Sequence, residues 1–81
     1  METRVALIGI IVEDDSLIIK LNEILHQYRQ YILGRMGLPY AKKEVSVISI
    51  CIDAPQDIIS ALSGKLGALK GITTKTIYSH I

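Results

Sequence analysis

Two segments of this chain are apolar at nearly every position, and this pattern limits the folds available to it. Residues 5–12 contain no polar side chain, and residues 45–52 contain two serines among apolar residues. A strand with one face in water alternates apolar and polar residues, so both segments predict strands that are covered on both faces. The rest of an 81-residue chain has room for two short helices, which can cover one face of a sheet. The other face then requires another layer, and the simplest is a second copy of the chain.

Turn, capping and periodicity signals predict two helices and two more strands. The expected strands are Arg4–Val12, Tyr31–Leu38, Glu44–Asp53 and Ile72–Tyr78. The first helix is expected over Leu17–Gln30, because apolar residues recur there at steps of three and four: Leu17, Leu21, Ile24, Leu25 and Tyr28. The second helix is expected to open at Ala54-Pro55 and to bury Ile58, Ile59, Leu62 and Leu66. The glycines of the Tyr31–Leu38 segment predict an irregular strand.

Short polar residues mark where these helices should begin, and glycines mark where they should end. Asp14, Asp15 or Ser16 can accept hydrogen bonds from the free amides of the first helix, and Asp53 is the expected cap of the second. Gly67 and Gly71 are stop signals. Gly64 falls inside the second helix, which suggests that a strand passes close to it there.

The order strand, helix, strand, strand, helix, strand predicts a single domain over residues 1–81. Two interleaved right-handed crossovers give an α+β, ferredoxin-like fold, with a four-stranded antiparallel sheet and two helices on one face. The first and third strands, which are the most apolar, are expected in the centre. In the third strand Ile48, Ile50 and Ile52 should face the helices. The residues that should face the open side, and form an oligomer interface, are Val45, Val47, Ser49 and Cys51.

The first strand offers two alternating sets, and the pattern alone does not choose between them. One set is Val5, Leu7, Gly9 and Ile11, and the other is Ala6, Ile8, Ile10 and Val12. Either set can face the helices, because both are apolar.

Composition excludes several classes of function. A net charge of +1 gives no electrostatic basis for direct nucleic-acid binding, and no uninterrupted apolar run reaches the length that spans a bilayer. Met1 is followed at once by Glu2, Arg4 and the first strand, so a cytoplasmic protein is expected. Cys51 is the only cysteine, which rules out an internal disulfide and favours a small core residue.

The titratable residues do not assemble into a catalytic or metal-binding motif. His26 lies mid-helix beside apolar residues and is expected to be partly buried and hydrogen-bonded, and His80 lies next to the C-terminus. The serines lack the context of a nucleophile elbow, and Gly64-Lys65 does not match a phosphate-binding loop. We therefore expect neither an enzyme nor a metal site.

Two short stretches are candidates for binding a small molecule. The first is Gly34-Arg35-Met36-Gly37, where paired glycines allow close approach and Arg35 can pair with a carboxylate or phosphate. The alternative is a bulged edge strand with a solvated arginine. The second is the acidic turn with Asp14 and Asp15, for which helix capping is the alternative.

Four segments resemble a small bacterial family of regulators of the iron-only hydrogenase system. They are Arg4–Val12, Leu21–His26, Gly34–Pro39 and Ser60–Gly67, and the resemblance extends over essentially the whole chain. It implies an ACT-like fold within the ferredoxin-like class, and a regulatory role.

The implied fold is also similar to the ligand-binding domain of the nickel-responsive repressor. In that relative a His-x-His pair on the third strand and a cysteine at the next helix hold nickel. The strand positions correspond here to Ser49 and Cys51, and the helix position falls near Asp57. Oxygen groups with one thiol do not make a square-planar nickel site, so nickel is not carried over.

Taken together, the residues and the resemblance predict a stand-alone ACT-like regulator that forms a homodimer or homotetramer. A small molecule is expected to bind where subunits meet, near Gly34–Gly37 or the turn after the first strand. The alternative is a ligand-free interaction module, which docks on a maturation or transcription partner through a sheet edge or face.

Overall fold

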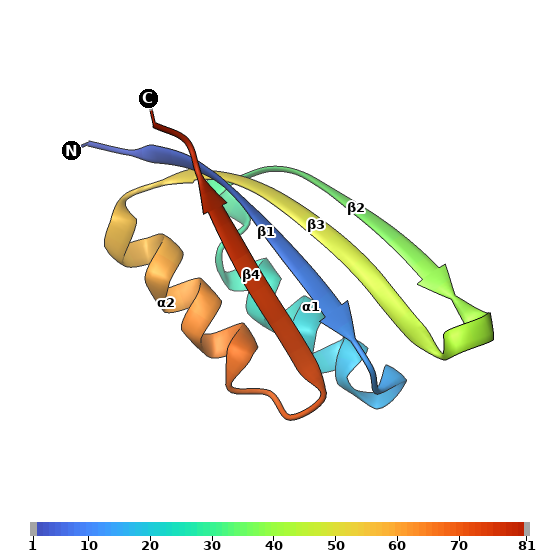
Figure 1. Ribbon diagram of the computed structural model, residues 1–81. Helices are drawn as coiled ribbons and strands as arrows, with labels where there is room; N and C mark the ends of the chain where they lie inside the picture. Colours follow the sequence, from blue (N-terminus) through green and yellow to red (C-terminus); the bar gives the residue numbers. More distant parts are fainter. Residues whose placement is uncertain (1, 81) are drawn as a thin grey trace.

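The computed structural model describes residues 2–80 and shows two layers, a sheet and a pair of helices (Figure 1). The strands are β1 (Arg4–Val12), β2 (Ile32–Tyr40), β3 (Val45–Ala54) and β4 (Ile72–Tyr78), and the helices are α1 (Ile18–Gln27) and α2 (Gln56–Gly67). Short 3-10 turns, η1 (Asp15–Leu17), η2 (Arg29–Tyr31) and η3 (Ala41–Lys43), join them. The sheet is antiparallel in the order β2-β3-β1-β4. The ferredoxin-like α+β fold and the central β1–β3 pair are therefore confirmed.

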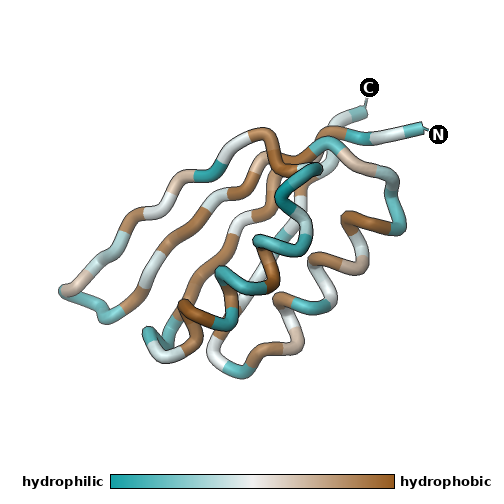
Figure 2. Tube along the Cα trace, turned by 180° about the vertical axis from the view of Figure 1, so that it is seen from behind, coloured by the Kyte–Doolittle hydropathy of each residue, from teal (hydrophilic) through white to brown (hydrophobic). Residues whose placement is uncertain are grey.

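The core lies between the sheet and the two helices. Ile48, Ile50 and Ile52 face the helices as predicted, and all three are buried. In β1 the set that faces the helices is Ala6, Ile8, Ile10 and Val12, each at most 2% exposed. The helices contribute Leu21, Ile24, Leu25, Tyr28, Ile59, Leu62 and Leu66. Hydrophobic residues follow the sheet, and hydrophilic ones gather at the β2–β3 turn (Figure 2).

Several predicted boundaries differ from the structure. Helix α1 is shorter than the predicted Leu17–Gln30, because Tyr28 leaves helical geometry at φ −110° and η2 then turns the chain into β2. Strand β2 continues through Pro39, beyond the predicted end at Leu38. An edge strand tolerates proline because its outer side needs no donor. The predicted irregularity of β2 is confirmed by a bulge between Ile32 and Gly34.

The start of α2 also differs from its prediction. Asp53 is not the cap, because β3 runs on to Ala54 and the cap position is Pro55. The carboxylate of Asp57 instead accepts a hydrogen bond from its neighbour's amide, the N–H of Ile58, at 3.0 Å. Likewise, no strand passes close to Gly64, since a Cβ placed there would meet nothing within 4 Å.

Gly71 is required by the backbone in the turn before β4. Its φ is +97°, and an added Cβ would lie 3.2 Å from Cδ1 of Leu17 and 3.4 Å from Cβ of Asp14. The carbonyl of Gly71 also accepts a hydrogen bond from the N–H of Glu13 at 2.8 Å. This turn thus packs directly against the turn that follows β1.

Alanine substitutions at Gly71 and Gly64 are expected to change stability in opposite directions. Gly71→Ala should lower the free energy of unfolding by at least about 1–2 kcal/mol, because a side chain is unfavourable at positive φ. Gly64→Ala, in an open helical position, should raise it by about 0.5–1 kcal/mol. Urea denaturation of both variants measures the difference. Equal effects of the same sign would contradict this account of the two glycines.

Candidate functional site

The face of the sheet opposite the helices is apolar and uncovered. Large side chains exposed there in the central strands are Val5, Leu7, Ile11 and Val47, at 37–44% exposure. The edge strands add Met36, Leu38, Tyr40 and Ile77, at 45–70%. We call these eight residues, together with Val45, Ser49 and Cys51, the open face. A contiguous apolar surface of this kind is typical of an interaction site.

All four predicted interface residues lie on this open face. Val45, Ser49 and Cys51 are half-buried by their neighbours in the sheet, and Val47 is 38% exposed. The expectation that Cys51 is a core residue is wrong, because it alternates with Ile50 and Ile52 and points away from the helices. The uncovered plane that the sequence predicted is therefore present in the structure.

The first predicted ligand stretch is divided between the two faces of β2. Gly34 pairs with Cys51 and Met36 with Ser49, so both lie on the same side of the sheet as the open face. Arg35 and Gly37 pair with Ile50 and Ile48, so both belong to the helix side. This division follows from the two-residue repeat of a strand.

Residues of this stretch and residues of the predicted interface line the same hollow. It is about 240 Å³ in volume and is lined by Leu7, Gly34, Arg35, Met36, Ser49 and Cys51. Gly34 has no side chain to fill the space beside Cys51, which explains why the surface is hollowed there. Gly37 is not part of the lining.

The acidic turn lies in a different place and caps a helical turn. Asp14 accepts hydrogen bonds from the N–H of Ser16 at 3.0 Å and from its hydroxyl at 2.7 Å. These hydrogen bonds lower the pKa of the Asp14 carboxyl below its ordinary value. The stabilisation they provide is complete above the unfolded-state pKa and is lost as the pH falls through the lower, folded-state pKa.

Asp15 lies within η1, and a hollow of about 470 Å³ is lined by Glu13, Asp14, Asp15, Ala41 and Glu44. This acidic hollow shares no residue with the one on the open face. The two predicted ligand stretches are therefore not brought together. Within residues 2–80 the structure groups no three histidine, cysteine or acidic side chains in a way that could hold a metal ion.

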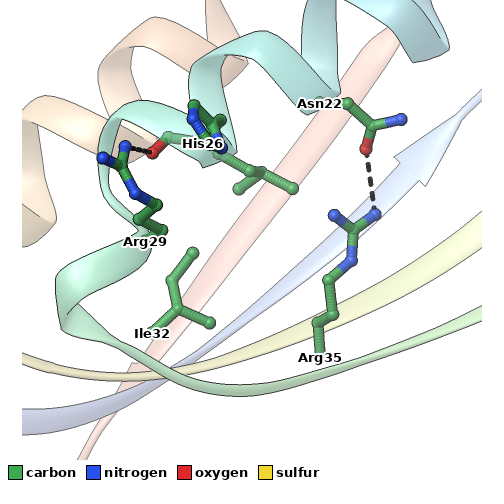
Figure 3. Close-up of a pocket in the computed structure, with 6 residues that line it drawn as sticks. Asn22, His26, Arg29, Ile32 and Arg35 are labelled. Carbon is green, nitrogen blue, oxygen red and sulfur yellow. Dashed lines mark hydrogen bonds between the residues drawn. The ribbon is translucent and has the colours of Figure 1, made fainter.

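A third hollow, which the sequence did not predict, lies between α1 and β2. It is about 240 Å³ in volume and is lined by Asn22, Leu25, His26, Arg29, Ile32 and Arg35 (Figure 3). His26 is exposed at its rim, so the prediction of a partly buried, hydrogen-bonded histidine is wrong. Asn22 and His26 are four residues apart on α1, a spacing that puts them on one helix face and that the sequence does show. Their position opposite Arg35 depends on how α1 packs on the sheet.

No helix within residues 2–80 combines the length and apolar character needed to cross a membrane.

Comparisons with known proteins agree with this architecture. Residues 4–76 match the TM1266-like family, described as "Iron-only hydrogenase system regulator, putative". Among solved structures, the uncharacterized protein TM1266 from Thermotoga maritima is similar at 33% identity and a TM-score of 0.91. That match covers 95% of this chain and 98% of the other.

A more distant likeness shows the fold alone. A formyltetrahydrofolate deformylase from Pseudomonas putida KT2440 matches at 11% identity and a TM-score of 0.65. The match covers 90% of this chain and 28% of that one. A comparison with curated proteins gives no match.

Proposed function

Because this chain belongs to the TM1266-like family of iron-only hydrogenase system regulators, we propose that it is a non-catalytic regulatory subunit that senses a small molecule between associated copies. The observation that carries the proposal is the hollow on the open face. Predicted ligand residues, Gly34 and Met36, meet predicted interface residues, Ser49 and Cys51, at this one place. A second copy seated on the open face would close the hollow over a bound molecule.

The exposed surface of a single subunit supports self-association. A folded monomer of 9.0 kDa is expected to expose about 4,900 Å², whereas this chain exposes 5483 Å². Four strands of seven to ten residues present a plane on the order of 600 Å². That area is close to the roughly 600 Å² per partner at the lower end of specific, stable interfaces.

The charge of the open face favours a second copy of the same chain as its partner. A two-fold interface places the same surface on both sides, so a strongly charged face would repel itself. None of the eleven open-face residues is acidic or basic. The register places two charged residues on the same side of the sheet, Lys75 opposite Gly9 and Asp53 opposite Val5, one of each sign. Because these two charges are of opposite sign, this side of the sheet carries no net charge that would make two copies repel each other.

The ligand would act by changing how subunits associate. A molecule that binds the closed hollow and not the separated subunits must shift the equilibrium toward the assembly. A downstream partner that recognises one assembly state would then respond to the ligand concentration. This is a regulatory device that requires no catalytic residue in the chain.

Two measurements on the unaltered protein test the proposal. Sedimentation equilibrium at micromolar concentration should report a dimer or tetramer. A thermal-shift panel of amino acids, nucleotides and other metabolites should contain a compound that raises the melting temperature. A ligand at 100 times its dissociation constant adds about 2.7 kcal/mol, which corresponds to an increase on the order of 10 °C in a domain of this size.

The two measurements also separate this proposal from its alternative. A folded 9.0 kDa monomer would refute the proposed assembly. An oligomer that no compound stabilises would refute ligand sensing and favour a ligand-free module that docks on a protein partner.

A further inference from the structure

We propose that the hollow between α1 and β2 binds a small organic or inorganic anion through carboxylate or phosphate oxygens. The hollow lies on the helix side of β2, and Arg35 is the one residue that it shares with the lining of the hollow on the open face, so it does not require a second copy to form. Its volume of about 240 Å³ corresponds to roughly eight water molecules. This is room for a dicarboxylate or a pyrophosphate.

The charges around this hollow favour an anion. Arg29 and Arg35 both line it, and no acidic residue does. Each guanidinium carries five N–H donors, one on Nε and two on each terminal nitrogen. Arg29 uses Nη1 to donate to the backbone carbonyl of His26 at 2.9 Å, and Arg35 uses Nη2 to donate to Oδ1 of Asn22 at 3.1 Å.

Both acceptors are neutral, so the two positive charges have no carboxylate partner among residues 2–80. Guanidinium groups bind carboxylate and phosphate with matching planar geometry and more strongly than they bind neutral acceptors. Two uncompensated guanidiniums at one hollow are therefore complementary to an oxyanion.

The arrangement of the side chains suits a ligand with two anionic groups. Figure 3 shows Arg29 and Arg35 on either side of Ile32, with both guanidinium groups reaching toward α1. His26 projects from the helix above them and offers a ring N–H. Leu25, which is 3% exposed, and half-buried Ile32 form an apolar floor, where charge-assisted hydrogen bonds are less exposed to water.

One feature of the fold opposes anion binding, and Arg29 offsets it. The hollow lies near the C-terminal end of α1, where the last carbonyls of the helix carry partial negative charge. Arg29 donates to one of these carbonyls, that of His26, and so places positive charge over the helix end. Acidic Glu23 lies on the neighbouring surface of α1, outside the lining of the hollow.

Titration of the protein with matched probes at low ionic strength tests the inference. Succinate and pyrophosphate serve as the carboxylate and phosphate arms, and neutral succinamide serves as the uncharged control. Calorimetry measures affinity, and amide chemical shifts show where each probe binds. At least one dianion should bind saturably and shift the amides of α1 and β2, and succinamide should not.

The variant Arg35→Gln should weaken this binding by about tenfold or more, because charge-assisted hydrogen bonds are lost. Arg35 is exposed and makes one exposed hydrogen bond, so the variant should fold, and circular dichroism checks this. Lys42→Gln removes the same charge from η3, outside the hollow, and should change the affinity by less than about twofold. Arg35→Lys keeps the positive charge but loses the planar donor geometry of the guanidinium. Its loss of affinity should therefore lie between those of Arg35→Gln and Lys42→Gln.

Three results would overturn the inference. They are no saturable binding of either dianion at millimolar concentration, equal losses in Arg35→Gln and Lys42→Gln, and equal binding of succinamide. Because binding is measured apart from sedimentation, a monomer that binds dianions would refute the proposed assembly and support the anion site.

Discussion

The variant Leu7→Lys is expected to lose self-association, with a dissociation constant at least about 100-fold higher than that of the unaltered chain. Leu7 lies in central strand β1, beside Cys51 on one side and Ile77 on the other, and is 44% exposed in the single subunit. A second copy on the open face would bury an unpaired ammonium at this position, which costs several kcal/mol. A 100-fold change corresponds to about 2.7 kcal/mol. Sedimentation equilibrium over a range of concentrations measures it.

Ile19→Lys is the matched control for this experiment. Ile19 is also a large exposed residue, at 73%, but it lies on α1 and not on the sheet. The same change of an apolar residue to lysine should therefore leave the assembly intact. Dissociation by both variants, or by neither, would count against the open face as the interface, provided that circular dichroism shows both to be folded.

The second large effect is expected from Ile59→Ala in the core. Ile59 is fully buried in α2 against the helix side of the sheet. Truncation of a buried isoleucine to alanine costs about 2–5 kcal/mol, from lost burial and from the cavity left behind. A domain of 81 residues has a stability of roughly 4–12 kcal/mol in total. The variant should therefore lose a large part of its free energy of unfolding, measured by urea denaturation at a fixed protein concentration.

The comparison for Ile59→Ala is the same substitution at Ile19. Both residues are isoleucines within helices, and alanine has the higher helix propensity at either place. Because Ile19 is 73% exposed, Ile19→Ala should change stability by less than about 0.5 kcal/mol. If the two variants were equally stable, α2 could not be packed on the sheet as the structure shows.

The sheet and its central pair were predictable because burial on two faces leaves a direct trace in the sequence. Residues 5–12 are apolar throughout, as expected of a central strand with apolar residues on both faces. The same uniformity hid the orientation of β1. Both alternating sets are apolar, and only packing against α1 and α2 shows that Ala6, Ile8, Ile10 and Val12 face the helices.

Predictions at element ends failed where tertiary contacts outweigh local propensity. Pro39 signals a turn, but it is paired with Ser46 at the edge of the sheet and remains in β2. Asp53 signals a helix cap, but pairing with Val5 keeps it in β3. Val5 is distant from Asp53 in the sequence, and Ser46 faces Pro39 across the hairpin, so the residues on either side of Pro39 or Asp53 do not reveal its pairing.

The candidate sites show the same limit. The sequence identified Gly34, Arg35 and Met36 together, but only the register of β2 against β3 shows that Arg35 is the one on the helix side. The approach of Arg35 to Asn22 depends on the angle at which α1 crosses the sheet. A hollow between two such elements cannot be read from either one alone.

The antiparallel pairing of β1 with β4 has a consequence for protein engineering. Val5 accepts a hydrogen bond from the N–H of Ser79 at 2.9 Å, and Arg4 donates to the carbonyl of Ser79 at 3.0 Å. The start of β1 therefore lies beside the end of β4 (Figure 1). A short glycine-rich linker could therefore join them, and new termini could be opened in η3 at the far end of the β2–β3 hairpin. Such a circular permutant would keep every strand pairing while moving an attached reporter from one end of the sheet to the other.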